Sequence, residues 1–260
     1  MTGPFWTMFT KPWPDLTVPQ LADLAARIGV GGIELPVRPG FQVEPETAER
    51  TLPEAARIFA DRGLVIADVA SSAEERVLAA CAEAGIPLVR IMLPIQGDDF
   101  LATADAARRL LDEMVPLCRR YQVAIGIQPH QDHFTSTGID LWNLVRDYDP
   151  LIGAAWDAGH EGLAGQPVQH SLSALRDRLH MVNMKNATYR QTGESPARWK
   201  QYWTTADQGL CDWAKTIEVL VSLGYDKSLC LCAEYSHGDV EQLVVEDFAY
   251  GRELLARARA

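Results

Sequence analysis

The sequence lacks a long apolar run, a signal-peptide pattern and a zinc-type spacing of cysteines. No stretch approaches the roughly 20 apolar residues that cross a bilayer. The first residues show no basic segment followed by an apolar one, as a signal peptide would. The five cysteines fit no zinc motif, so we expect reduced, buried thiols. These absences predict a cytoplasmic protein with no membrane partner.

Basic residues are also scarce, since 24 lysines and arginines stand against 35 aspartates and glutamates, for a net charge of −11. Such an acidic chain repels phosphate backbones, and we expect no nucleic-acid partner. No Gly-x-Ser-x-Gly, Walker A or His-Glu-x-x-His pattern occurs, and no pattern marks a Ser/His/Asp triad. What remains is a composition with 47% hydrophobic and 23% charged residues, which is typical of a globular protein.

Eight short β-type runs alternate with amphipathic helical patterns along the whole chain. Most of these runs are almost entirely apolar, as in strands that are buried on both faces. The expected strands are Trp6–Phe9, Gly32–Leu35, Val65–Val69, Val89–Leu93, Val123–Gln128, Ile152–Asp157, His180–Met184 and Ser228–Glu234. The expected helices are Val18–Ile28, Pro53–Arg62, Ala73–Ala84, Leu101–Tyr121, Leu141–Tyr148, Val168–Arg178, Trp213–Leu223 and Val240–Ala258.

This alternation predicts an α/β fold, a single (β/α)8 TIM barrel that spans residues 1–260 without a linker. The alternative is an open doubly wound sheet, but no G-x-G-x-x-G motif follows the first strand. A long βα loop follows the seventh strand at about residues 185–212. Loops of this length are usually functional, and we expect it to cover a pocket and exclude water. Its large side chains are Tyr189, Arg190, Trp199, Tyr202 and Trp203.

Active sites of such barrels lie at the carboxyl ends of the strands, where five expected strands end in polar residues. Strand six ends at Asp157, and Gly159 allows His160 to fold back beside it. The pair is either a ligand carboxylate with a substrate-binding imidazole or a helix cap with a surface histidine. Strand five ends at Gln128, with His130 two residues later. We expect both in the pocket, the alternative being a glutamine bonded inside the barrel mouth.

Glu234 ends the last expected strand, where a buried carboxylate needs an ion pair or a metal. Partial burial raises the pKa of a carboxylate toward the working pH, so Glu234 is the expected catalytic base. Asn183 and Lys185 alternate onto one face at the end of strand seven. Lys185 either binds the substrate or neutralises Glu234 and Asp157 in a structural ion pair.

Two charged residues near the second strand complete the candidate set. Glu34 ends that strand and is an expected substrate-binding residue. Arg38 follows in a loop rich in proline and glycine, where it can bind an anion. Arg90 lies within a strand, and we expect it to be structural.

Several of these segments resemble the xylose isomerase-like TIM barrel superfamily. That group includes sugar phosphate isomerases and epimerases, ketohexose 3-epimerases, inosose dehydratases and an endonuclease type. The resemblance covers essentially the whole chain. It rests on GVGGIEL at 29–35, IGIQPH at 125–130, IGAAWDAGH at 152–160, HMVNMKN at 180–186, GLCDW at 209–213 and LGYDKSLCLCAEY at 223–235.

In the epimerase-like members, a Glu, an Asp, a His and a Glu at the ends of strands five to eight hold a divalent metal. The resemblance places Gln128, Asp157, Asn183 and Glu234 at these positions, so two ligands are replaced by neutral amides. Such a set favours magnesium, manganese or calcium over zinc, or leaves the site without a metal. The segment LPVRPGF at 35–41 is similar to a branch with the same glutamine, which indicates a variant site.

The resemblance implies an isomerase or epimerase that acts on a small polyhydroxylated carbonyl compound, a sugar or polyol. Proton exchange by two glutamates is not available, so Glu234 would act alone on a proton alpha to the carbonyl. His160, His130 or Lys185 would supply the acid. The alternatives are a keto-inositol dehydratase and a non-catalytic sugar-binding barrel that has lost its metal. The loops with tryptophan and tyrosine also suggest a homodimer.

Overall fold

Eight parallel strands close into a barrel in the order β1-β10-β7-β6-β5-β4-β3-β2. The computed structural model describes residues 3–193 and 196–260 of the chain. This architecture confirms the predicted (β/α)8 barrel. The barrel strands are β1 Phe5–Phe9, β2 Gly32–Pro36, β3 Val65–Ala70, β4 Leu88–Ile91, β5 Ala124–Ile127, β6 Ile152–Asp157, β7 Leu179–Met184 and β10 Ser228–Leu231.

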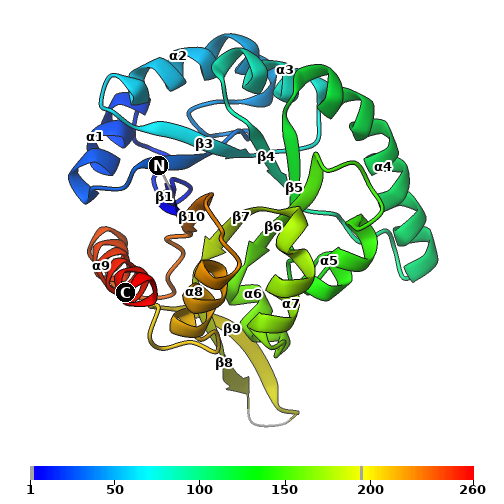
Figure 1. Cartoon of the computed structure of the whole chain (residues 1–260), viewed down its shortest axis with the longest axis vertical. Coiled ribbons are helices and arrows are strands. Elements are labelled where there is room, and N and C mark those ends of the chain that lie inside the picture. The colour runs from blue at the N-terminus through cyan, green and yellow to red at the C-terminus, as the bar shows by residue number, and fades with distance from the viewer. Residues whose placement is uncertain (1–2, 194–195) are drawn as a thin grey trace.

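The helices lie outside the strands and form an outer ring (Figure 1). Three of them end at a glycine with positive φ, α1 at Gly29, α3 at Gly85 and α6 at Gly165, a conformation that glycine adopts without strain. Asp212 and Asp239 cap the helices before the last strand and at the end of the chain. The helices are α1 Val18–Ile28, α2 Ala48–Ala60, α3 Glu75–Ala84, α4 Phe100–Tyr121, α5 Gly138–Val145, α6 Ala158–Ala164, α7 Val168–Leu175, α8 Trp213–Ser222 and α9 Val240–Arg259, with 3-10 turns η1 Pro45–Thr47 and η2 Arg176–Arg178.

The buried side chains form two layers. The larger layer packs between strands and helices and includes Trp156 and Trp213. A smaller cluster, which includes Met181, fills the interior of the barrel. Side chains alternate along a strand, so the inward position of Met181 directs Asn183 and Lys185 to the same interior, nearer the carboxyl end. The register of β7 therefore sets which residues reach the site.

The structure differs from the sequence-based expectation at a few elements. Helix α6 was not expected, because its seven residues include two glycines that hide the helical pattern. Helix α2 begins at Ala48, five residues before the expected start, and accommodates Pro53 in its interior. Strand β10 ends at Leu231, so Glu234 lies in the loop beyond it.

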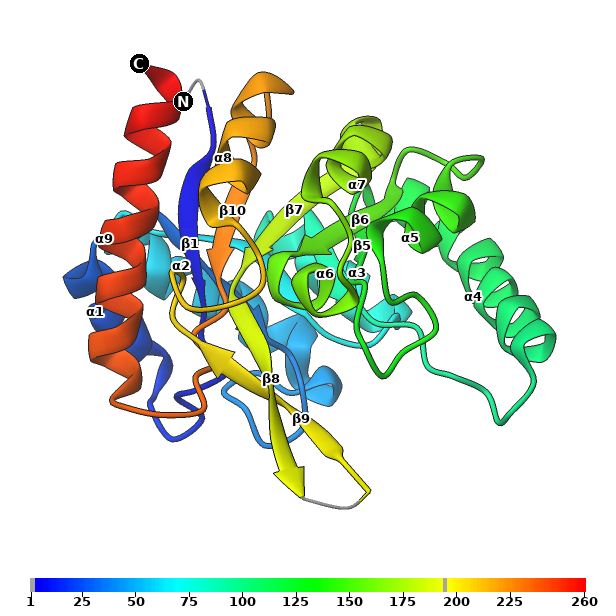
Figure 2. The same ribbon diagram turned by 90° about the horizontal axis from the view of Figure 1, so that it is seen from below.

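The long segment after β7 is an antiparallel hairpin of β8 Asn186–Gly193 and β9 Arg198–Thr204. Figure 2 shows it projecting from the barrel on the side opposite both chain termini. Its outer part is open to solvent, since Trp199 is 62% exposed. Within the described ranges, no helix combines the length and apolar character that crossing a bilayer requires.

Candidate active site

The centre of the candidate site is a lysine placed between two carboxylates. Lys185 directly follows β7, whose neighbours in the barrel are β6, which ends at Asp157, and β10, which precedes Glu234. The Nζ atom of Lys185 lies 3.4 Å from Asp157 Oδ2 and 3.4 Å from Glu234 Oε2. Lys185 and Asp157 are buried, whereas the Glu234 side chain is 22% exposed. Three of the predicted site residues are thus brought together by adjacent strands.

These groups determine one another's charge. Burial opposes the charge of Lys185, but Asp157 and Glu234 outweigh it and raise the lysine's pKa above its ordinary value. Burial alone would raise the pKa of Glu234, but the ammonium groups of Lys185 and Lys11 lower it to about 2. The expected upward shift for Glu234 is therefore wrong. Lys185 is the larger cause of the lowered pKa, and Lys11, which binds Glu234 from the loop after β1, adds to it.

Arg90 is a second buried cation, and it connects the carboxylate of β2 to this centre. Its Nε donates to Glu34, and its Nη1 donates to Oε1 of Gln128. The amide nitrogen of Gln128 in turn donates to Asp157 Oδ2 at 2.6 Å. Burial opposes the charge of Arg90, but Glu34 raises its pKa. These contacts agree with the structural role expected for Arg90, and they also decide which atom of Gln128 points toward Asp157.

Two histidines line the opposite side of Lys185. The backbone N–H of His160 donates to Asp157 Oδ1 at 3.0 Å, and its Nε2 lies 3.2 Å from Lys185 Nζ. Its ring centroid is 3.9 Å from that of His130. Burial, reinforced by the charge of Lys185, lowers the pKa of His160 to about 2 and that of His130 to about 4. Both imidazoles are therefore neutral at pH 7, and His160 is buried rather than at the surface.

The structure confirms the helix cap at Asp157, although His160 is buried, and the role of Asp157 as a ligand stays a prediction. Its Oδ1 caps α6 by accepting the backbone N–H of His160. Its Oδ2 faces Gln128 and Lys185 in the network described above. The helix cap and the site contact therefore use different oxygens of one carboxylate.

A small cavity of about 40 Å³ opens beside this network. This volume has room for one or two water molecules, at about 30 Å³ each, so a sugar must displace side chains to enter. A cavity of about 660 Å³ lies among Phe5, Leu88 and His180, near the amino ends of the strands, but no predicted site residue lines it. We place the site at the smaller cavity because the charged groups converge there. The lining residues are Phe9, Lys11, Arg38, Arg90, Met92, Gln128, His130, Lys185, Cys232 and Glu234.

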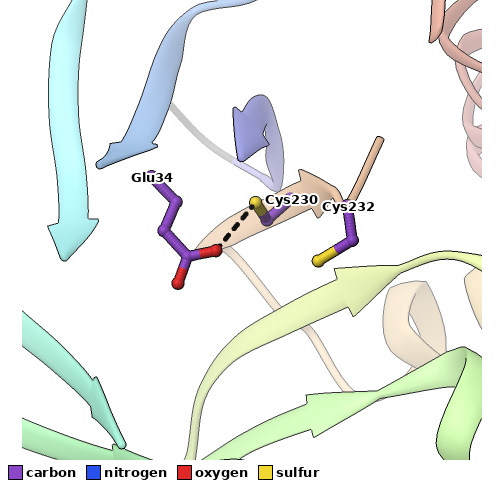
Figure 3. A group of neighbouring side chains, drawn as sticks. All are labelled: Glu34, Cys230 and Cys232. Atoms are coloured by element: carbon purple, nitrogen blue, oxygen red, sulfur yellow. Dashed lines mark hydrogen bonds between the residues drawn. The ribbon is translucent and has the colours of Figure 1, made fainter. Parts of the chain in front are cut away.

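Glu34, Cys230 and Cys232 form a second cluster deeper in the barrel (Figure 3). Their potential ligand atoms all lie within 4.8 Å of one another, the spacing of a metal site. The Cys230 thiol, however, donates to Glu34 Oε2 at 3.6 Å, and Glu34 is also paired with Arg90. Burial raises the pKa of Cys230 well above its ordinary value, so the sulfur keeps its proton. These contacts account for the cluster without an ion.

The β8–β9 hairpin covers the centre of the site. Trp203 of β9 lies over Lys185, whose Nζ is 4.3 Å from the ring centroid. Gly159 permits this approach, because a Cβ atom there would lie 2.9 Å from Lys185 Cγ and 3.2 Å from the Trp203 ring. Gln201 of β9 donates to the Gln131 side chain at 2.9 Å and ties the hairpin to the loop after β5. Of the five large side chains expected to cover the pocket, Trp203 is the one that contacts Lys185 within the described residues.

The carboxylates at this centre leave little room for a divalent cation. Asp157 is bound to Lys185, and Glu234 is bound to both Lys185 and Lys11. Two carboxylates are therefore already balanced by two ammonium groups. Two unit charges 4 Å apart repel by about 4 kcal/mol at an effective dielectric constant of 20, and a divalent ion doubles this figure.

The two amides add no better ligand. The oxygen of Gln128 accepts from Arg90, so only its nitrogen points toward Asp157. Asn183 is fully buried next to Asp157 in the register, and neither its oxygen nor its nitrogen has a hydrogen-bond partner in the described part of the chain. Asn183 alone keeps spare acceptor capacity. The donor set does not fit a divalent cation as it stands, and the metal remains a prediction.

Glu161 is a buried acid beside the site that the sequence analysis did not single out. Its Oε2 accepts the Gly138 backbone N–H at 2.8 Å, while Oε1 has no partner in the described structure. Burial raises its pKa from 4.5 to about 7. A raised pKa means that the folded state holds the proton more tightly than the unfolded state. Stability is therefore lost as the pH rises from about 4.5 to 7.

We expect Glu161→Gln to remove this loss, because the amide keeps an acceptor for Gly138 and carries no charge. At pH 8 the free energy of unfolding should exceed that of the wild type by about 1–2 kcal/mol, and the gain should vanish below about pH 4.5. Urea unfolding at several pH values measures it. The exposed Glu54→Gln on α2 is the matched control and should show no such difference. A gain in stability that persists at pH 4 would show that ionisation of Glu161 is not its cause.

The chain belongs to the xylose isomerase-like TIM barrel family, whose model matches residues 22–254. No curated protein matches the chain. Among solved structures, it is similar to the 3-keto-D-glucoside 4-epimerase of E. coli, with a TM-score of 0.77 and 12% identity over 96% of this chain and 99% of that one.

Two further structures have comparable likeness. A xylose isomerase-like TIM barrel protein of Mycobacterium smegmatis in complex with magnesium has a TM-score of 0.73 and 17% identity over 100% and 98% of the two chains. The mannonate dehydratase of Streptococcus suis serotype 2 has a TM-score of 0.74 and 11% identity over 99% and 94%. At these identities the likeness shows the fold alone.

Proposed function

We propose that the protein is a sugar isomerase or epimerase that moves a proton alpha to the carbonyl of a small polyhydroxylated compound. One observation carries this proposal, namely the Lys185 ammonium held 3.4 Å from the Glu234 carboxylate beside a cavity. A carboxylate can remove the proton, and a neighbouring cation can stabilise the negative charge that develops on the carbonyl oxygen. The family neighbours support the reaction class, since they include two sugar epimerases and a dehydratase.

Glu234 is the proposed base. It lines the cavity and is ionised at neutral pH, because the two lysines lower its pKa. This stabilisation also makes it a weak base while both lysines bind it. A substrate oxygen that takes over one hydrogen bond of Lys185 would relieve Glu234 and raise its pKa. Substrate binding thereby activates the base.

Lys185 is the proposed electrophile, and His160 positions it. Nε2 of His160 lies 3.2 Å from Lys185 Nζ, and its Nδ1 lies 3.4 Å from the backbone nitrogen of Gln131. A neutral imidazole has a single acceptor nitrogen, and the charged Lys185 is the stronger and nearer donor, so we assign the acceptor to Nε2 and the proton to Nδ1. The neutral ring therefore holds the ammonium without competing for the substrate oxygen. Trp203 covers this arrangement and excludes water from it.

The charges of the cavity favour a substrate with an anionic group. Lys11, Arg38, Arg90 and Lys185 line it together with a single carboxylate. Lys11, Arg90 and Lys185 each have a carboxylate partner, whereas Arg38 has none within the described residues and donates only to the Ala70 carbonyl, at 3.3 Å. Arg38 is thus free to bind a carboxylate or phosphate of the substrate.

Deuterium exchange in heavy water tests the proposal. The wild-type protein is incubated with ketoses, inososes, sugar acids and sugar phosphates, and incorporation at the carbon alpha to the carbonyl is followed by NMR. Exchange with at least one compound, fastest among those with an anionic group, supports the proposal. A complete absence of exchange, together with a rise in Tm on adding a sugar, would instead favour the non-catalytic sugar-binding barrel.

A dehydratase is the second candidate. It begins with the same proton removal, and the enolate then expels hydroxide. The proton that Glu234 has taken then passes to the leaving oxygen, to which the neutral imidazole of His130 in the cavity lining can donate a hydrogen bond. Product analysis separates the two reactions, because an epimerase returns an isomer and a dehydratase returns a product that has lost one water.

A further inference from the structure

Lys185 makes every contact that an ammonium group can make. Its three N–H bonds are matched by three acceptors, Asp157 Oδ2 at 3.4 Å, Glu234 Oε2 at 3.4 Å and His160 Nε2 at 3.2 Å. The indole of Trp203 lies against the same atom. The group is buried, so this position is fixed by packing as well as by charge.

We propose that the Lys185 ammonium is the resident cation of this site, and that it replaces a divalent metal ion. It lies between Asp157 at the end of β6 and Glu234 in the loop after β10, the position from which an ion could bind both. Lys11 balances the remaining charge of Glu234. The role of the ammonium in turnover rests on the proposed function, but its occupation of the cation position does not.

An ammonium group in place of a metal ion also explains why neutral amides stand at Gln128 and Asn183. With a lysine present, a carboxylate at Gln128 would add buried negative charge that no further cation balances, and a histidine at Asn183 would have no metal to bind. Gln128 instead bridges Arg90 and Asp157 without changing the net charge. The site is therefore a self-consistent arrangement of paired charges rather than a metal site with missing ligands.

The proposal predicts that removing the ammonium creates a metal site. Lys185→Ala leaves Asp157 without a cation and Glu234 with Lys11 alone, on either side of the space, with the unbonded oxygen of Asn183 nearby. Oxygen ligands of this kind suit Mn²⁺ and Mg²⁺. We expect Lys185→Ala to bind Mn²⁺ with a Kd of about 0.1–1 mM, whereas the wild type should show no saturable binding up to about 10 mM.

Free Mn²⁺ is measured by EPR in titrations without substrate. Lys11→Ala is the matched control, because it removes an ammonium from Glu234 but leaves Lys185 between the carboxylates. It should bind Mn²⁺ as weakly as the wild type. Asp157→Asn added to Lys185→Ala should abolish the new binding. Lys185→Met, which keeps the apolar stem beside Trp203, is the second variant, and circular dichroism verifies that each variant is folded.

Saturable Mn²⁺ binding by the wild type below about 1 mM would overturn the proposal, as would folded Lys185→Ala and Lys185→Met variants that bind no metal. If neither variant folds, the Tm of the wild type tests the proposal. It should be unchanged by EDTA and by Mn²⁺, and a shift with either would overturn the proposal. These measurements use no substrate, so they stand whether or not deuterium exchange is found. If deuterium exchange is found, it should persist in EDTA. Loss of exchange in EDTA would overturn the proposal that Lys185 replaces a metal, but it would leave the proposed isomerase or epimerase function intact.

Discussion

Replacing Glu234 with glutamine is expected to lower the rate of alpha-proton exchange by about 10²–10⁴-fold, the usual contribution of a general base. The amide keeps the size of the side chain and can still accept a hydrogen bond from Lys185 or Lys11, but it cannot take a proton. The initial rate of deuterium incorporation measures the loss. The effect should fall mainly on kcat, because the substrate contacts of Lys185 and Arg38 remain.

Glu241→Gln provides the control for this prediction. Glu241 is also paired with a basic side chain, Arg27, but it lies exposed in the first turn of α9, away from the cavity. Its substitution should leave exchange unchanged. If Glu234→Gln kept more than about a tenth of the wild-type rate, another group would have to be the base.

Arg90→Met is expected to lower the free energy of unfolding by about 3–5 kcal/mol, because it leaves a buried charge without a partner. The side chains of Arg90 and Glu34 are 4% and 0% exposed. Without the guanidinium, the Glu34 carboxylate retains only the Cys230 thiol as a donor among the described contacts, and Gln128 Oε1 loses its donor. Urea unfolding followed by circular dichroism measures the change.

The double variant Arg90→Met with Glu34→Gln tests the cause. Removing both charges eliminates the uncompensated carboxylate, so the double variant should recover at least about half of the lost stability. Simple loss of packing would make the double variant no more stable than Arg90→Met. That result would show that Arg90 contributes mainly through its volume.

The barrel was predictable because its signal is local. Each strand is a short apolar run, and each helix has its own periodicity and its own end signal, such as Gly29 or Gly85. The position of the site followed from the same pattern, since polar residues end apolar strands. This reasoning brought Asp157, Lys185 and Glu234 to one rim, where the structure places them within 3.4 Å contacts.

The charge state of the site was not predictable, because it depends on pairs that are distant in the sequence. Lys11 and Glu234 are 223 residues apart, and Arg90 and Gln128 are 38 apart. Neither pair leaves a spacing pattern, so the sequence predicts a raised pKa for Glu234 and gives no sign that Arg90 orients Gln128. The segment 186–204 was expected to be a covering loop, and its two strands were not foreseen. Their residues are mostly polar and exposed and lack the apolar alternation that marks a buried strand.

The two oxygens of Asp157 have a consequence for measurement. One oxygen accepts the backbone N–H of His160 in the first turn of α6, and the other holds the Lys185 ammonium, so a change of partner at the second oxygen alters the electron density at the first. The amide of His160 therefore reports on events at the pocket from a position in the main chain. Its hydrogen-exchange rate and its nitrogen chemical shift provide a readout of ligand arrival that requires neither turnover nor an added label.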